Sequence, residues 1–296
     1  MNNPVCHICA GGRAKLFMQK ESCDFYRCPD CGLEFIFPQP DDTALKKIYS
    51  ENYYDAWGLN VDSHTAEKSK RATFEYRMNL IRNNLKEGDA ILDCGCATGI
   101  FLDLVKEEGY VPFGVEISEY GVSECRKKFG EQNIFHGQFE DAHFGNEKEN
   151  FFTAIFMTDY LEHVRNPRRI LQTAFRFLKP GGVLVITTPD TSSFSHWLMN
   201  RSWIHYKSEH LFYLSISNLG RLLSEEKLKL MIHKKGWKYF TADYVNHQFR
   251  TYHHPVFTPL SNLLNKITPR ALSKKMFRFH AGEMIVVAGK FQSENE

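Results

Sequence analysis

The sequence predicts an α/β fold in which a doubly wound, mostly parallel sheet follows a small cysteine-rich segment and a helical region. From residue 88 onward, short apolar runs alternate with stretches of helical periodicity. The first run leads into a glycine-rich loop, and five of the eight cysteines lie within the first 31 residues. Strands that alternate with helices of about 10–15 residues are typical of βαβ units, and such units build parallel sheets.

The chain has 296 residues, a length that suggests about two domains. It is 43% hydrophobic and 24% charged, which excludes wholesale disorder. Its net charge of +2 lacks the basic excess of proteins whose main partner is a nucleic acid. No apolar run approaches the roughly 20 residues needed to cross a bilayer, and no secretory signal is recognised. We therefore expect a cytoplasmic protein, and the oligomeric state stays open.

Two CxxC pairs, separated by 18 residues, form a cysteine box at the start of the chain. Two such pairs commonly hold a tetrahedral zinc, since each tight turn presents two thiolates from one side. The flanking short strands indicate a zinc ribbon, and four thiolates close the site, so the metal is expected to be structural. A redox pair is the alternative. Cys23 and His7 are expected not to be ligands. The expected zinc ligands are Cys6, Cys9, Cys28 and Cys31.

The rest of the chain divides by its periodicity. The zinc ribbon covers residues 1–40, a helical cap or linker 41–85, and the α/β domain 86–296. An aromatic-rich insertion at about 191–214 is expected to form a lid over a pocket, and a second insertion occupies about 246–280. The expected strands are residues 90–94, 111–116, 133–136, 153–158, 183–188, 237–245 and 283–291.

The loop after the first strand of the α/β domain carries the first chemical signal. Ligands of open α/β sheets bind beyond the carboxyl ends of the strands, where Asp93, Gly95 and Gly99 lie. Asp93 suits a positively charged group better than a pyrophosphate. Glu116 ends the second strand, 21 residues after Gly95, where a carboxylate can accept hydrogen bonds from ribose hydroxyls. The Gly-x-x-x-Gly spacing differs from the dinucleotide fingerprint, which disfavours an NAD enzyme.

Further motifs follow in order along the chain: residues 137–140 (GQFE), 161–167 (LEHVRNP), 177–189 (FLKPGGVLVITTP), 209–211 (EHL) and the final strand at 284–290. With the loop at 91–99, they resemble the class I S-adenosylmethionine-dependent methyltransferases over most of residues 86–291. The resemblance implies a Rossmann-like, seven-stranded methyltransferase sheet and S-adenosylmethionine as the cofactor.

The resemblance also implies which residues hold the cofactor. The chain departs from the family's pattern at Gln138 and Thr153, where an acidic residue is common. Gln138 can still accept a hydrogen bond from the adenine amino group. Cys94 and Cys125 are expected to pack in the core. The expected cofactor-binding residues are Asp93, Gly95, Cys96, Ala97, Gly99, Glu116, Ile117, Gln138, Phe139, Thr158 and Tyr54, the last as a cap.

The reaction would need proximity and in-line alignment, because the sulfonium methyl is already activated. An oxygen or carbon acceptor also benefits from a general base, and histidine is the commonest. His163 follows the fourth strand and His210 lies in the aromatic insertion, so both are candidate bases. Glu209 is expected to orient or charge-tune His210. Core packing is the alternative role for both histidines.

The zinc box together with Glu209-His210 resembles the zinc-containing methyltransferases that act on nucleotide-linked sugars. This resemblance implies a small-molecule acceptor, plausibly a sugar, a nucleotide-sugar or a glycan precursor in carbohydrate biosynthesis. An RNA or protein methyltransferase that uses the ribbon for recognition, and a non-catalytic cofactor-binding assembly module, are the alternatives. The basic amphipathic stretch at 256–278 either contacts a membrane surface or forms a solvated helix face. The acceptor atom (O, N or C) stays open.

Overall fold

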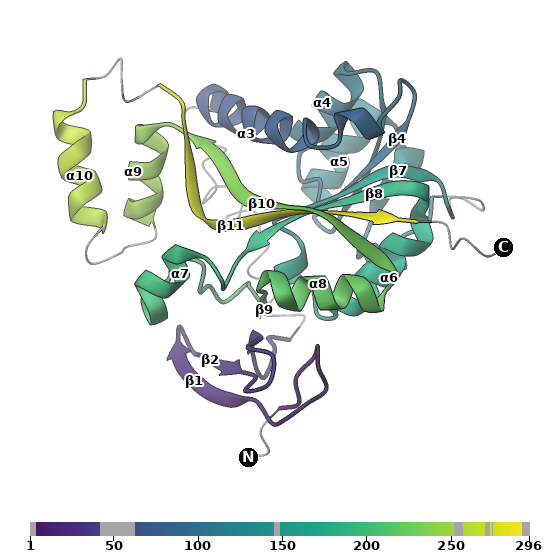
Figure 1. Ribbon diagram of the computed structural model, residues 1–296. Helices are drawn as coiled ribbons and strands as arrows, with labels where there is room; N and C mark the ends of the chain where they lie inside the picture. The colour runs from purple at the N-terminus through teal and green to yellow at the C-terminus, as the bar shows by residue number, and fades with distance from the viewer. Residues whose placement is uncertain are drawn as a thin grey trace.

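The computed structural model describes residues 4–41, 63–144, 149–251, 257–269, 273 and 275–291. Their strands form two sheets, a central seven-stranded sheet of order β10-β11-β8-β7-β4-β5-β6 and a smaller four-stranded sheet of order β1-β2-β3-β9. Figure 1 shows the smaller sheet below the central one, next to the N-terminus. The predicted Rossmann-like, seven-stranded α/β fold is confirmed.

The central sheet is parallel except at β11, which pairs antiparallel with both β8 and β10. Its inner strands are continuous apolar runs because helices cover both faces, as is usual for parallel sheets. All five residues of β4 are buried, for example. The strands are β4 (Ala90–Cys94), β5 (Val111–Glu116), β6 (Ile134–His136), β7 (Phe152–Thr158), β8 (Leu178–Pro189), β10 (Leu228–Phe240) and β11 (Phe277–Lys290).

The helices divide between the two faces of this sheet. Alternate residues of β4 show the division, since Ile91 packs with α3 and α4 while Leu92 packs with α6 and α8. A separate cluster packs α5 against α4 and the glycine-rich loop. The helices are α3 (Ser63–Met78), α4 (Ile100–Glu107), α5 (Glu119–Phe129), α6 (Pro167–Phe177), α7 (Phe194–Met199), α8 (Ile216–Glu225), α9 (Ala242–Thr251) and α10 (Phe257–Ile267). Single 3₁₀ turns lie at Arg82–Asn84, Glu131–Asn133, Phe139–Asp141, Leu161–His163 and Asn200–Ser202.

The strand predicted at 237–245 is wrong in its bounds. β10 begins at Leu228 and ends at Phe240, and the residues after it form α9. β10 is an edge strand with much of its length exposed, so it carries lysines where inner strands carry apolar residues. This charge-rich pattern gives no apolar run from which its start could be predicted.

The small N-terminal sheet is completed by a strand that lies far along the chain, within the aromatic insertion. β1 (Lys15–Lys20), β2 (Cys23–Arg27) and β3 (Glu34–Ile36) belong to the cysteine-rich segment, whereas β9 (Phe212–Tyr213) comes from the aromatic insertion. Trp203 and Tyr206 of that insertion are fully buried in one cluster with Phe25 of β2. Most of the aromatic residues expected in a lid therefore attach the small N-terminal sheet to the rest of the chain.

The remainder of the aromatic insertion stays at the surface. In α7, Phe194 is 71% exposed and Trp197 is 73% exposed. The second insertion forms α9 and α10, which pack on each other and project to the left in Figure 1. Within the described residues, no helix has the length and apolar character to span a membrane.

Candidate active site

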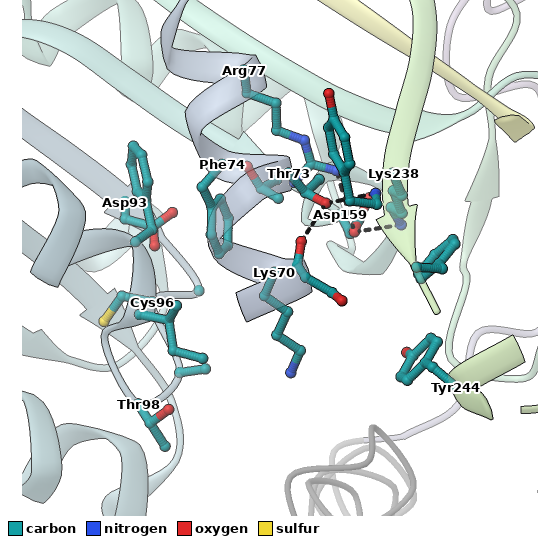
Figure 2. Close-up of a pocket in the computed structure, with 18 residues that line it drawn as sticks. Lys70, Thr73, Phe74, Arg77, Asp93, Cys96, Thr98, Asp159, Lys238 and Tyr244 are labelled. Atoms are coloured by element: carbon teal, nitrogen blue, oxygen red, sulfur yellow. Dashed lines mark hydrogen bonds and ion pairs between the residues drawn. The ribbon is translucent and has the colours of Figure 1, made fainter. Parts of the chain in front are cut away.

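A cavity of about 260 Å³ opens beside the carboxyl end of β4. Its walls come from the glycine-rich loop, from α3, from the ends of β7 and β10, and from α9. Figure 2 shows these walls, with Asp93 and Cys96 on one side, α3 behind and Tyr244 on the other side. This is the crevice in which open α/β sheets bind their ligands.

The glycine-rich loop turns sharply between β4 and α4. Gly95 and Gly99 have φ of +77° and +84°, a region that favours glycine. A Cβ atom on Gly99 would lie 2.7 Å from Phe129 Cε2 and 3.0 Å from Cys125 Sγ. The close packing of this turn on α5 therefore requires glycine, and it holds the backbone of Cys96 against the cavity.

Asp93 places a carboxyl group in the cavity wall. It is only 4% exposed, and within the described part of the chain its carboxyl group makes no hydrogen bond or ion pair. Burial and the nearby Glu116 raise the pKa of Asp93, whereas the Arg77 guanidinium lowers it. A buried carboxylate without a partner is unfavourable, so the site suits a ligand that brings a positive charge or a hydrogen-bond donor.

Glu116 fastens the loop to the end of β5. Its carboxylate accepts hydrogen bonds from the backbone amides of Ala97 (2.8 Å), Ile117 (2.9 Å) and Ser118 (2.8 Å). The side chain is almost fully buried, and Ile117 beside it is half exposed. Glu116 therefore lies next to the glycine-rich loop.

The expected cofactor residues have different surroundings. Five of them line the cavity, namely Asp93, Gly95, Cys96, Ala97 and Thr158. Gln138 is exposed at the end of β6. Phe139 is fully buried against Phe177, so its side chain packs in the core and does not form a ligand wall. Tyr54 lies outside the described residues.

A buried charge network at the back of the cavity was missing from the sequence prediction. Lys238 Nζ lies 2.9 Å from Asp159 Oδ2 and 2.6 Å from Glu283 Oε1, and Arg77 Nη2 lies 4.0 Å from Asp159. Burial alone would raise the pKa of Asp159, but Lys238 and Arg77 hold it below its usual range. Asp159 directly follows β7 at the ligand edge of the sheet, and this position is a signal that could have identified it.

Helix α3 contributes a second set of unpredicted wall residues. Lys70, Thr73, Phe74 and Arg77 lie one or two turns apart on the face that borders the cavity. Thr73 Oγ accepts a hydrogen bond from the Tyr239 amide, which fixes α3 to β10. Burial, followed by the charge of Lys238, lowers the pKa of Lys70 to about 8.

The two candidate histidines lie together, and Glu162 is their neighbour. A carboxylate oxygen of Glu162 and one ring nitrogen each of His163 and His210 all lie within 4.8 Å of one another. Nδ1 of His163 donates to the Glu209 carbonyl (3.1 Å), and Nδ1 of His210 donates to the His205 carbonyl (2.9 Å). Carbonyl oxygens only accept, so in each neutral ring the lone pair is on Nε2.

The surroundings of this cluster modify the expected roles. Burial lowers the pKa of His163 to about 4, and burial with Asp159 raises the pKa of Glu162 to about 8. Glu209 was expected to orient His210, but its carboxylate lies near Lys207 and Ser208, and its carbonyl orients His163 instead. Among the described wall residues of the cavity, neither histidine is present.

The four cysteines of the box come together from two segments, one before β1 and one between β2 and β3. Their sulfurs lie within 4.8 Å of one another, with Cys6 Sγ 3.5 Å from Cys31 Sγ and Cys9 Sγ 3.5 Å from Cys28 Sγ. Four sulfurs about 2.3 Å from a tetrahedral zinc lie about 3.8 Å apart, so the donor set and its spacing fit this metal. Backbone amides of Ile8 and Gly11 point at the sulfurs of Cys6 and Cys9, which would stabilise thiolates.

The sequence profile of a methyltransferase domain matches residues 66–233, which is more than half of the chain. The chain belongs to this methyltransferase family. The matched segment contains most of α3, the glycine-rich loop, Glu116 and the histidine cluster.

Relatives of the methyltransferase support the fold. A ubiquinone biosynthesis O-methyltransferase of Coxiella burnetii is 27% identical over 103 residues, 34% of this chain and 44% of that protein. The chain thus matches less than half the length of such curated relatives. The 1,6-didemethyltoxoflavin N1-methyltransferase of Burkholderia thailandensis, solved with S-adenosylhomocysteine, has 11% identity and a TM-score of 0.52, covering 94% of this chain and all of that one.

A further solved structure shows that the fold does not determine the reaction. The cyclase SpnF has 15% identity and a TM-score of 0.57, covering 86% of this chain and 99% of that one. A cyclase and a methyltransferase thus share the architecture, so the architecture alone does not determine the reaction of this chain.

Proposed function

We propose that the protein transfers a methyl group from S-adenosylmethionine to a small-molecule acceptor. The observation that carries this proposal is the buried carboxyl group of Asp93, without a partner in the described chain, on the wall of a cavity at the ligand edge of the sheet. S-adenosylmethionine brings an ammonium group to satisfy such a carboxylate. Family membership adds independent support.

The residues present fit the amino-acid part and the ribose of this cofactor. Asp93 would bind the ammonium group, and Arg77, whose buried Nε has no partner among the described residues, would bind the carboxylate. Glu116 would exchange part of its bonding to backbone amides for the ribose hydroxyls. The cofactor supplies a methyl group activated by a sulfonium. When bound, it would let an oxygen or nitrogen of the acceptor take the methyl group and leave S-adenosylhomocysteine, and a base of this chain would take the proton that the acceptor loses.

His163 is our proposed base for that proton. Its neutral ring carries the lone pair on Nε2, and it is more exposed than His210. His210 and Glu162 lie beside it and would share the proton, while Glu209 would act as a positioning residue through its carbonyl. Burial lowers the pKa of His163, and the negative charge of Asp159 partly offsets this effect by stabilising the protonated ring.

A sugar or a nucleotide-linked sugar is our proposed acceptor class. The support is the resemblance to zinc-containing sugar methyltransferases at Glu209-His210 and the cysteine box. We also propose a structural zinc on the four cysteines, which a reducing compartment such as the cytoplasm would keep as thiols. The division into residues 1–40, 41–85 and 86–296 remains our proposal for the domains. Strand β9, from the third of these segments, also belongs to the sheet of the first.

Calorimetric titration with S-adenosylhomocysteine tests the core of the proposal. We expect the wild type to bind and Asp93→Asn to bind at least tenfold more weakly, because a charge-assisted hydrogen bond is lost. Asp103→Asn, a change at a partly exposed carboxylate of α4 that pairs with Lys128 and does not line the cavity, is the matched control. No binding by the wild type would refute the proposed cofactor.

A turnover screen tests the acceptor and the base. Nucleotide-sugars and small metabolites would be offered with S-adenosylmethionine, and release of S-adenosylhomocysteine would be measured. For an acceptor that is turned over, His163→Ala should lower kcat by about 10²–10⁴ with little change in cofactor affinity. Unchanged turnover in this variant would contradict the role given to His163.

A further inference from the structure

Lys70 is a cation on the cavity wall that the cofactor does not require. Its side chain comes from the first half of α3 and extends along the cavity. In the part of the chain that the structure describes, no carboxylate or carbonyl group bonds to its ammonium group. We propose that Lys70 binds an anionic group of the acceptor, a phosphate or a carboxylate. This inference rests on the proposed function.

The other cations at the cavity already have nearby carboxylates. Lys238 contacts both Asp159 and Glu283, and Arg77 lies 4.0 Å from Asp159. Lys70 is only partly exposed yet lacks such a neighbour among the described residues, and an ammonium group that is removed from water without a partner is unfavourable. Its pKa of about 8 reports this environment. An anion that enters with the ligand would remove the penalty.

The cofactor's own carboxylate belongs elsewhere. In S-adenosylmethionine the carboxylate and the ammonium group are bonded to the same carbon, so the two must bind side by side. Asp93 is the carboxylate suited to the ammonium group, and the cation whose charge lowers the pKa of Asp93 is Arg77. Lys70 lies two turns before Arg77 on α3, about 10 Å along the helix axis. Figure 2 shows its side chain directed away from Arg77 and Asp159.

The neighbouring wall indicates what the anion is attached to. Phe240 and Tyr244 also line the cavity, and their rings stack with centroids 5.1 Å apart and planes 7° apart. Such a flat aromatic pair presents a surface on which a ring of the ligand can pack. A lysine ammonium is a compact point charge that suits phosphate. The combination fits an acceptor that carries both a ring and an anionic group.

Binding of simple anions to the protein saturated with S-adenosylhomocysteine tests the inference. The probes are uridine diphosphate, inorganic phosphate and acetate, each titrated calorimetrically. We expect the wild type to bind at least one probe, Lys70→Met to bind it at least tenfold more weakly, and Lys70→Arg to retain most of the affinity. Lys68→Met, an exposed lysine on the same helix, is the control and should behave as the wild type. Phosphate-type and acetate binding distinguish the two kinds of anion.

Three results would overturn the inference. They are the absence of binding of all three probes, equal binding by the wild type and Lys70→Met, and a tenfold loss of S-adenosylhomocysteine affinity in Lys70→Met, which would place Lys70 in the cofactor site. Failure of the wild type to bind S-adenosylhomocysteine would instead defeat the proposed function. Unfolding of each variant would be followed by circular dichroism, and Lys70→Arg keeps the test decisive if Lys70→Met does not fold.

Discussion

One buried carboxylate contributes to the attachment of the small N-terminal sheet to the rest of the chain, and replacing Tyr206 by phenylalanine tests this contribution. Glu34 of β3 is 2% exposed. Its carboxylate accepts a hydrogen bond from the Tyr206 hydroxyl. It also lies 2.6 Å from Arg27 Nη2 and 3.5 Å from His196 Nε2. Tyr206 and His196 come from the aromatic insertion, so the carboxylate joins the two parts of the chain.

The magnitude follows from what phenylalanine keeps and what it removes. The ring of Tyr206 is fully buried among other aromatic rings, and phenylalanine preserves those contacts. The hydrogen bond from its hydroxyl to a charged carboxylate contributes about 1.5–3 kcal/mol. Total stabilities are about 5–15 kcal/mol, so Tyr206→Phe should produce a clearly measurable loss. We expect a decrease of about 2 kcal/mol in the free energy of unfolding.

Urea unfolding, followed by far-UV circular dichroism with zinc present throughout, would measure the loss. Tyr26→Phe is the matched control, because the hydroxyl of Tyr26 has no hydrogen-bond partner in the described structure while its ring stacks on Phe35. Adding Glu34→Gln completes a double-mutant cycle, and the coupling energy should account for most of the loss. If Tyr206→Phe costs less than about 0.5 kcal/mol, or no more than Tyr26→Phe, the argument is refuted.

The same contact gives a pH dependence. Burial alone would raise the pKa of Glu34, but hydrogen bonds from His196 and Tyr206 and the charge of Arg27 lower it. A carboxyl group with a lowered folded-state pKa contributes stability at neutral pH, and this is lost as the pH falls through the folded-state pKa. The difference in the free energy of unfolding between the wild type and Tyr206→Phe should therefore be largest at neutral pH. It should decrease as the pH falls below the ordinary pKa range of carboxyl groups. An unchanged difference in acid would contradict this explanation.

Three further predictions concern the metal, the loop and Lys70. Elemental analysis should find about one zinc per chain in the wild type and markedly less in Cys28→Ser, with loss of ribbon stability; equal zinc in both would count against the four-cysteine site. Gly99→Ala should destabilise the fold by about 1–3 kcal/mol, because φ is +84° and the added Cβ meets Phe129, whereas Gly220→Ala in the open part of α8 should be neutral or stabilising. The pKa of Lys70 is about 8, against 10.5 in the unfolded chain, so the unfolded state holds more protons between these two pH values. The free energy of unfolding of the wild type should therefore rise with pH in this window, and that of Lys70→Met should rise less.

The fold could be predicted largely because its inner strands are buried on both faces. The expected strands at 90–94 and 111–116 coincide with β4 and β5, whose apolar runs end at Asp93-Cys94 and Glu116. Strand β10 could not be predicted in the same way, since an exposed edge strand tolerates charges along its length. Burial on both sides makes the local sequence informative, and exposure removes that constraint.

The site was predictable where its residues follow strands and was not where they meet across the fold. Asp93 and Glu116 lie at strand ends, which the sequence identifies. Lys238 meets Asp159 across 79 positions of sequence, and its burial follows only from the pairing of β10 with β11. The role expected of Glu209 was wrong for a similar reason, because adjacency to His210 in sequence did not determine where its carboxylate points.

The ribbon and the histidine cluster are joined through one short segment of backbone. The Ile36 amide of β3 donates to the Leu211 carbonyl (3.0 Å), and the Leu211 amide donates to the Glu162 carbonyl (2.7 Å). Leu211 directly follows His210, so the strand that completes the small sheet also sets the position of the proposed proton-accepting cluster. A closed four-cysteine zinc site has no direct part in chemistry. Loss of the proposed zinc should nevertheless disturb this backbone connection and lower turnover more than it lowers cofactor affinity. The glycine-rich loop is held separately by Glu116 and α5.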